Sequence, residues 1–83
     1  MRKSLYTAGQ YKVAKTVRAM RADANLTQRA LAARLKRPLN VVSRIEAGQR
    51  RVDLLEWVAL CQACDVDPVD AGRKLLKDIA QHR

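Results

Sequence analysis

Apolar side chains recur every three or four positions along most of this chain, which is the spacing that places them on one face of an α-helix. The first such stripe is formed by Tyr11, Ala14, Val17 and Met20, with lysines and arginines on the other faces. No repeat, low-complexity tract or linker interrupts the pattern. We therefore expect residues 1–83 to form one all-α domain. The predicted helices span about residues 10–24, 27–35, 38–47, 53–64 and 69–81.

Residues with known preferences for helix ends support these boundaries. Asn25 suits the left-handed position just after a helix, and Gly48 is expected to end the third helix in the same way. Thr27 and Asp53 are good N-caps for the second and fourth helices. Pro38, whose φ is fixed, is expected to begin the third.

The pattern also predicts which side chains face the interior. In the fourth helix we expect Leu54, Val58 and Cys61 to point inward. Only 4% of the residues are aromatic although 48% are hydrophobic, so the core should be aliphatic, as in packed helices. The residues that the second and third helices are expected to bury are Ala30, Leu31, Leu35, Val42 and Ile45.

The net charge of +9 is unevenly distributed along the chain. Residues 1–28 carry six Lys/Arg and one acid, and residues 29–51 carry seven Lys/Arg and one acid. Residues 52–83 carry four basic and six acidic residues. Binding of a polyanion is the simplest interpretation of this asymmetry. The alternative is a basic domain whose charges serve only solubility.

Neither a membrane span nor a secretory signal is expected. No run of 18 apolar residues exists, and Arg2 and Lys3 are not followed by an apolar segment. We therefore expect a cytoplasmic protein with no membrane partner.

The most informative stretch consists of the two short amphipathic helices predicted at 27–35 and 38–47. A tight turn joins them, and a basic loop follows. This arrangement places one helix in the major groove of DNA while the other braces against the backbone. It predicts a helix-turn-helix at about residues 27–47.

The motifs in this stretch resemble those of the lambda-repressor-like, Cro-type (XRE) helix-turn-helix family. The resemblance implies a five-helix DNA-binding domain, usually a dimer on a near-palindromic operator. Further pieces, Arg37-Pro38, Gly48 to Asp53 and Val66-Asp67-Pro68, are similar to a small stand-alone bacterial and phage subgroup. The motifs that carry the family resemblance are Leu26-Thr27-Gln28, Leu31-Ala32, Leu35 and Val42-Ser43-Arg44-Ile45-Glu46-x-Gly48.

The resemblance implies which residues reach base edges. Asn40 is suited to adenine, Arg44 to guanine or a phosphate, and Leu39 to a thymine methyl group. The alternative is ordinary exposed helix surface. The full set of expected base contacts is Leu39, Asn40, Val41, Ser43 and Arg44.

The resemblance also implies phosphate contacts by Gln28, at the start of the second helix, and by Arg37, Arg50 and Arg51. Such contacts position the protein without reading sequence directly. A solvated charged loop is the alternative for the arginines.

The family's structural ion pair corresponds here to Arg21 and Glu46. Glu46 is the only acid between residues 24 and 52, so it needs a partner in a region that is otherwise positive.

Two positions depart from the family pattern. Lys36 stands where a turn glycine is usual, and a left-handed lysine costs about 1 kcal/mol. Leu39-Asn40 stands where the subgroup often has Gln-Ser. Since leucine cannot form a bidentate hydrogen bond to adenine, we expect a different operator.

The spacing Cys61-x-x-Cys64 is the one motif of the chain that suggests a metal or redox site. A structural zinc site needs four ligands, and only His82 remains as a further one in the chain. Two buried thiols are the expected interpretation, with a redox or metal switch as the alternative. We expect no metal, no cofactor and no enzymatic activity.

The sequence therefore predicts a sequence-specific transcriptional regulator, a dimeric repressor that binds double-stranded DNA. The last helix is expected to form the homodimer through Leu75, Leu76 and Ile79, although it could instead only cover the core of one subunit. The alternative function is an antitoxin-type adaptor, whose main partner is a protein and whose DNA binding is autoregulatory.

Overall fold

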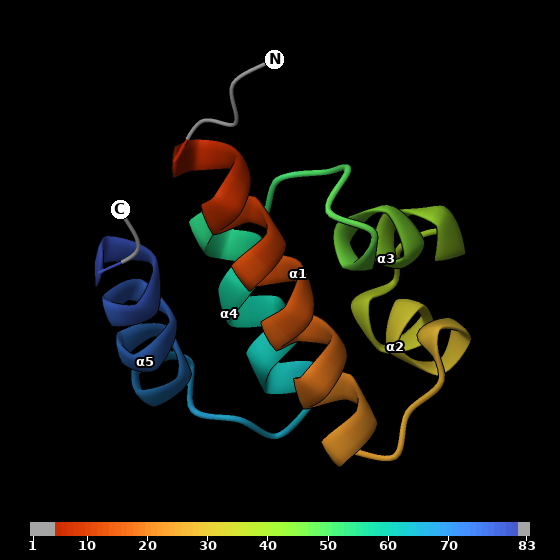
Figure 1. The fold of residues 1–83 in the computed structure, drawn as a ribbon. Helices are drawn as coiled ribbons and strands as arrows, with labels where there is room; N and C mark the ends of the chain where they lie inside the picture. Colours follow the sequence, from red (N-terminus) through yellow and green to blue (C-terminus); the bar gives the residue numbers. More distant parts are fainter. Residues whose placement is uncertain (1–4, 82–83) are drawn as a thin grey trace.

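The computed structural model describes residues 5–81, and within this range it contains helices and no strands. The predicted all-α, five-helix fold is confirmed (Figure 1). No helix in the described part of the chain is both long and apolar enough to cross a membrane. The helices are α1 (Leu5–Asp23), α2 (Gln28–Leu35), α3 (Leu39–Glu46), α4 (Leu54–Ala63) and α5 (Pro68–Gln81).

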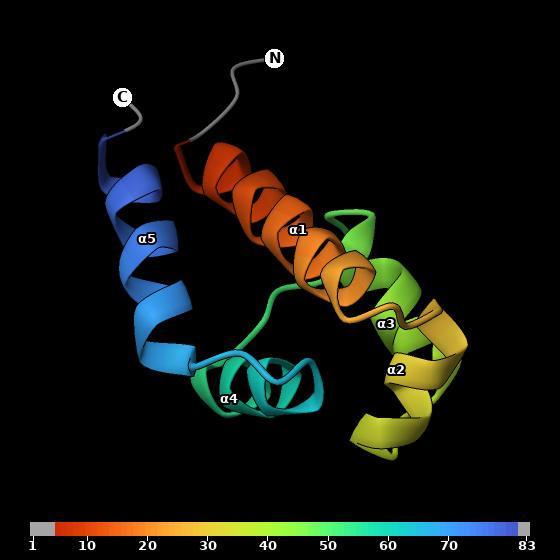
Figure 2. The ribbon, with the colours of Figure 1, turned by 90° about the horizontal axis from the view of Figure 1, so that it is seen from below.

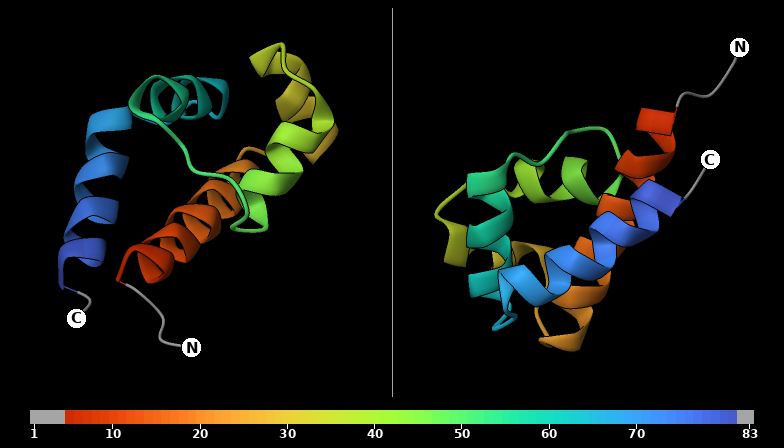
Figure 3. Two further views of the ribbon diagram at one scale, coloured as in Figure 1. Left: turned by 90° about the horizontal axis from the view of Figure 1, so that it is seen from above. Right: turned by 90° about the vertical axis from the view of Figure 1, so that its left-hand side faces the viewer.

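Helix α1 runs through the middle of the molecule. Helix α5 packs on one side of it, and the α2–α3 pair lies on the other side (Figures 1 and 2). Helix α4 contacts both α2 and α5 and so closes the domain opposite α1 (Figure 3). As a result, α3 and α5 lie on opposite sides of α1.

The helix ends follow the predicted caps. The Thr27 hydroxyl accepts a hydrogen bond from the Ala30 amide at 3.0 Å. Asp53 accepts one from the Glu56 amide at 2.7 Å. Asn25 is left-handed at φ 58°, and Gly48 has φ 75°. The hydrogen bonds to Thr27 and Asp53 satisfy amides that the N-terminus of a helix leaves without partners.

Helix α1 begins several residues earlier than predicted. Glycine lowers helix propensity, yet Gly9 lies inside α1 and is buried. A β-carbon on Gly9 would lie 3.3 Å from a methyl group of Ile79 on α5. The glycine therefore allows α1 and α5 to pack closely at this point.

The core lies where α1, α2, α3 and α4 meet. The prediction that Leu54 and Val58 point inward is wrong, because they are 83% and 38% exposed. The prediction for Cys61 is confirmed, and α4 also buries Leu60, while Cys64 is buried just after the helix ends. Nearly every face of this helix is apolar, so its sequence does not select one face. The largest fully buried side chains are Leu31, Leu60, Val17, Val42 and Cys61.

Candidate nucleic-acid interface

A short turn fixes α2 and α3 relative to each other. Lys36 is left-handed at φ 56° and ψ 43°, and its amide donates to the Ala33 carbonyl at 3.1 Å. The Arg37 amide donates to the Ala32 carbonyl at 3.0 Å. Pro38 then takes an extended conformation and leads into α3. These bonds close the end of α2, so the turn holds α3 at a defined angle.

Helix α3 has one buried and one exposed face. Val42, Ile45 and Glu46 are buried, whereas Asn40 and Arg44 are exposed. The other expected base contacts, Leu39, Val41 and Ser43, are half-buried. Val41 packs against the core, so only its exposed part remains for DNA. Asn40 and Arg44 are therefore the most accessible side chains of the expected set.

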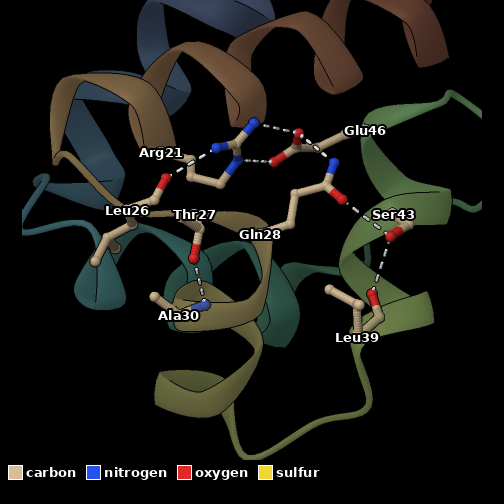
Figure 4. A network of polar contacts seen from close by, with 8 residues as sticks. All are labelled: Arg21, Leu26, Thr27, Gln28, Ala30, Leu39, Ser43 and Glu46. Atoms are coloured by element: carbon tan, nitrogen blue, oxygen red, sulfur yellow. Dashed lines mark hydrogen bonds and ion pairs between the residues drawn. The ribbon is translucent and has the colours of Figure 1, made fainter.

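Arg21 and Glu46 form the ion pair that the family resemblance implied, and it joins α1 to α3 (Figure 4). Arg21 Nε lies 2.6 Å from Glu46 Oε2, and Arg21 Nη2 lies 3.0 Å from Glu46 Oε1. Arg21 also donates to the Leu26 carbonyl at 2.8 Å. Hydrogen bonding to Glu46 raises the pKa of Arg21, against the opposing effect of burial.

Gln28 extends this network from the start of α2 (Figure 4). Its side-chain amide nitrogen donates to Glu46 at 3.0 Å, and its oxygen accepts from the Ser43 hydroxyl at 3.0 Å. Ser43 also lies within hydrogen-bond distance of the Leu39 carbonyl, at 3.3 Å. Gln28 and Ser43 therefore orient α3 against α1 and α2. Any contact of these two residues with DNA has to use their remaining hydrogen-bonding capacity.

A second ionic cluster lies at the start of α4, where it joins the segments before and after α3. Arg50 makes two hydrogen bonds to the Glu56 carboxylate, at 3.0 and 2.7 Å. Arg37 Nη2 lies 3.8 Å from the same carboxylate. The Asp53 amide also donates to Glu56, at 3.2 Å, which completes a capping box. The hydrogen bonds from Arg50 lower the pKa of Glu56, although burial acts in the opposite direction.

Glu56 was not among the site residues predicted from the sequence. The available signal was the spacing Asp53-x-x-Glu56, which is typical of a capping box. Of the expected phosphate contacts, Arg50 is thus hydrogen-bonded to an acid, Arg37 lies within ion-pair distance of the same acid, and Arg51 is exposed.

Cys61 and Cys64 lie in the core. Cys61 is fully buried, and its thiol lies 3.9 Å from the Met20 sulfur. Burial raises the pKa of Cys61 to about 11 and also raises that of Cys64. Burial and a high pKa are typical of inert thiols. Within residues 5–81 no group of three or more His, Cys, Asp or Glu side chains could hold a metal, and His82 lies outside the described residues.

The residues expected to form a dimer occupy different environments. Leu75 is buried within its own chain and Ile79 is half-buried against α1, whereas Leu76 is 66% exposed. Leu54 of α4 and Leu76 of α5 line a hollow of about 140 Å³ between these helices. Other large apolar side chains exposed on α4 and α5 are Leu55, Val58 and Val69.

Comparison with known proteins places these features in a family. A family model described as a helix-turn-helix domain matches residues 13–73. An XRE-family like protein from Pseudomonas syringae pv. tomato str. DC3000 is 33% identical, with a TM-score of 0.80 over 88% of this chain and 89% of that one. The restriction-modification controller protein C.AhdI from Aeromonas hydrophila is 30% identical, with a TM-score of 0.71 over 77% of this chain and 97% of that one.

The restriction-modification controller protein C.Esp1396I shares the fold at 22% identity. Its structure as a tetramer in complex with its natural 35 base-pair operator gives a TM-score of 0.75 over 88% of this chain and 96% of that one. No curated protein sequence matches the chain.

Proposed function

Because this chain belongs to the XRE-type helix-turn-helix family of DNA-binding transcription regulators, we propose that it is a repressor that binds a near-palindromic operator as a dimer. The observation that carries the proposal is the exposed face of α3. It presents Asn40 and Arg44 on a rigid support, within a segment that carries seven basic residues and one acid.

Helix α3 enters the major groove in this proposal. Asn40 pairs with the N6 and N7 atoms of adenine, and Arg44 pairs with the O6 and N7 atoms of guanine. Leu39 packs on a thymine methyl group, with Val41 and Ser43 at the margin of the contact. A good bidentate pair discriminates against the wrong base by about 1–3 kcal/mol.

The proposed phosphate contacts include residues just before and just after α3 in the chain. Gln28 lies at the N-terminus of α2, where backbone amides favour an anion. Arg37 precedes α3, and Arg50 and Arg51 follow it. These contacts set the register on the duplex, and they make affinity fall as salt rises because bound phosphates release counterions.

The dimer forms through the exposed apolar side chains of α4 and α5. One such domain reads only a few base pairs, whereas a dimer reads two half-sites about 34 Å apart. Helix α5 lies across α1 from the α2–α3 pair, so pairing at Leu76 and Leu54 leaves α3 free for DNA (Figure 1). The operator-bound tetramer of C.Esp1396I is a precedent for assembly in this fold.

Repression in this proposal is steric, because a dimer that covers a promoter excludes other proteins from the same grooves. The site of action is the cytoplasm, where the operator is accessible.

Selection of binding sites from a random duplex library at about 0.15 M salt tests this function. We expect a palindrome whose half-sites are about one helical turn apart to be enriched. Salt-sensitive binding to all duplexes alike, with no enriched sequence, would contradict the proposal. That result would instead favour an adaptor whose main partner is a protein.

A further inference from the structure

Two arginines at opposite ends of α3 converge on one carboxylate. Arg37 lies in the turn before α3, and Arg50 lies in the loop after it, yet both contact Glu56 on α4. The Glu56 side chain is 18% exposed, and it also accepts the Asp53 amide of its capping box. This partly buried acid holds Arg50 by two hydrogen bonds, and it holds Arg37, whose side chain is 46% exposed, by a longer ion pair at 3.8 Å.

Glu56 leaves both arginines able to bind a phosphate. A guanidinium has five N–H donors. Arg50 uses two of them on Glu56, and one of its terminal nitrogens also lies 3.3 Å from the Arg51 carbonyl. Other donors remain for an anion. The Asp53 carboxylate also acts on Arg50, so it is these unused N–H donors that an anion can approach.

Holding an arginine in place changes what it contributes to DNA binding. A mobile arginine finds a phosphate in any register, so it strengthens binding to every sequence alike. An arginine held at a fixed point finds its phosphate only when the protein sits in one register, since phosphate contacts fix position and orientation. Two fixed points, one at each end of α3, define how that helix lies in the groove.

We propose that Glu56 is a positioning residue of the DNA interface, which holds Arg37 and Arg50 so that both reach phosphates when α3 is in register with the bases. This inference rests on the proposed function and adds a determinant of its specificity. Glu56 acts through the two arginines and does not itself touch DNA.

The test compares Glu56→Gln with wild type on the selected duplex and on a scrambled duplex of the same composition. The glutamine oxygen can still accept the Asp53 amide, so the cap is kept while the charge is lost. Asp70→Asn is the matched control. It removes one exposed acid whose partner is Arg73 on α5, far along the chain from the interface. Circular dichroism checks that each variant is folded.

For Glu56→Gln we expect the ratio of specific to non-specific affinity to fall about tenfold, the size of losing one charged hydrogen bond. Affinity for the scrambled duplex should stay the same or increase. Asp70→Asn should leave the ratio unchanged. In an Arg50→Ala background, Glu56→Gln should change the ratio much less, because its main partner is gone.

Other outcomes would overturn the inference. If Glu56→Gln tightened binding to both duplexes equally, Glu56 would only repel DNA. If the ratio stayed at the wild-type value, Glu56 would serve the capping box alone. If wild type itself did not distinguish the two duplexes, the proposed function would fail, and this inference with it.

Discussion

At the residue scale, Glu46 links three helices. It is 4% exposed, and it accepts hydrogen bonds from Arg21 and Gln28, so it joins α1, α2 and α3. Because the three helices meet at this carboxylate, the orientation of α3 depends on it (Figure 4).

Glu46→Ala should lower the free energy of unfolding by about 3–5 kcal/mol, because it leaves a partly buried guanidinium without its partner. Urea denaturation followed by circular dichroism measures the change. Asp70→Asn, which affects an exposed pair, should stay within about 0.5 kcal/mol. A loss for Glu46→Ala no larger than that of the control would contradict the structural role of the pair.

Lys36 is strained in the turn, since its φ of 56° is unfavourable for a residue with a β-carbon. Lys36→Gly should therefore raise stability by about 1 kcal/mol. Because Lys36 is next to Arg37, a proposed phosphate contact, we also expect it to lie near a phosphate, so the variant should bind DNA more weakly and its salt slope should be smaller by about 0.9. Lys36→Ala should reduce the salt slope by the same amount but should not raise stability. If neither variant changed the salt dependence, Lys36 would not lie near a phosphate.

Cys61 should make the protein sensitive to alkali. Its pKa is raised from 9.0 to about 11 in the folded state, because burial disfavours the thiolate. Its stabilising contribution is therefore complete below pH 9 and is lost as pH rises toward 11. From about pH 8 to pH 10 this single group should remove about 1 kcal/mol of stability.

The measurement is the free energy of unfolding of wild type and Cys61→Ala at both pH values. The variant should lose less stability over this interval, since other titrating groups are common to both proteins. Identical losses would show that Cys61 does not govern the alkaline response.

At the element scale, the capped helix ends were predictable from the sequence, whereas the start of α1 and the buried face of α4 were not. Thr27 and Asp53 act through bonds to residues three positions away, so the signal is local. The orientation of α4 depends on where α2 and α5 pack against it. Leu54 and Leu60 are the same residue type, yet one is exposed and the other is buried.

The candidate interface shows the same division. The exposure of Asn40 and Arg44 follows from the amphipathic pattern of α3 itself. The contact between Arg37 and Glu56 joins residues on different elements, and it exists only once α4 has packed against α2. No local pattern contains that information.

The outer faces of α4 and α5 give a prediction for assembly. Leu76→Glu should disrupt the proposed dimer because it places a charge in the proposed apolar contact, and it should cost little stability because Leu76 is 66% exposed. Ala22→Glu on the exposed surface of α1 introduces the same charge as a control. Sedimentation equilibrium reports the oligomeric state. A Leu76→Glu protein that stays dimeric would place the dimer contact elsewhere.

At the scale of the whole molecule, charge and apolar surface are separated. Residues 29–51, which include α2 and α3, carry seven basic residues and one acid. Residues 52–83, which include α4 and α5, carry more acids than bases and also several exposed leucine and valine side chains. This separation is what the proposed function requires, with the first region on DNA and the second against another subunit.

In the proposed function, the outer face of α3 reads the operator. The most direct measurement repeats the binding-site selection with Arg44→Ala and with Arg51→Ala. We predict that the sequences selected by Arg44→Ala show a weaker base preference at one position of each half-site. Arg51→Ala should select the same sequence as wild type, but it should bind every duplex more weakly. If Arg44→Ala enriched the wild-type sequence just as strongly at every position, α3 would not be the reading element.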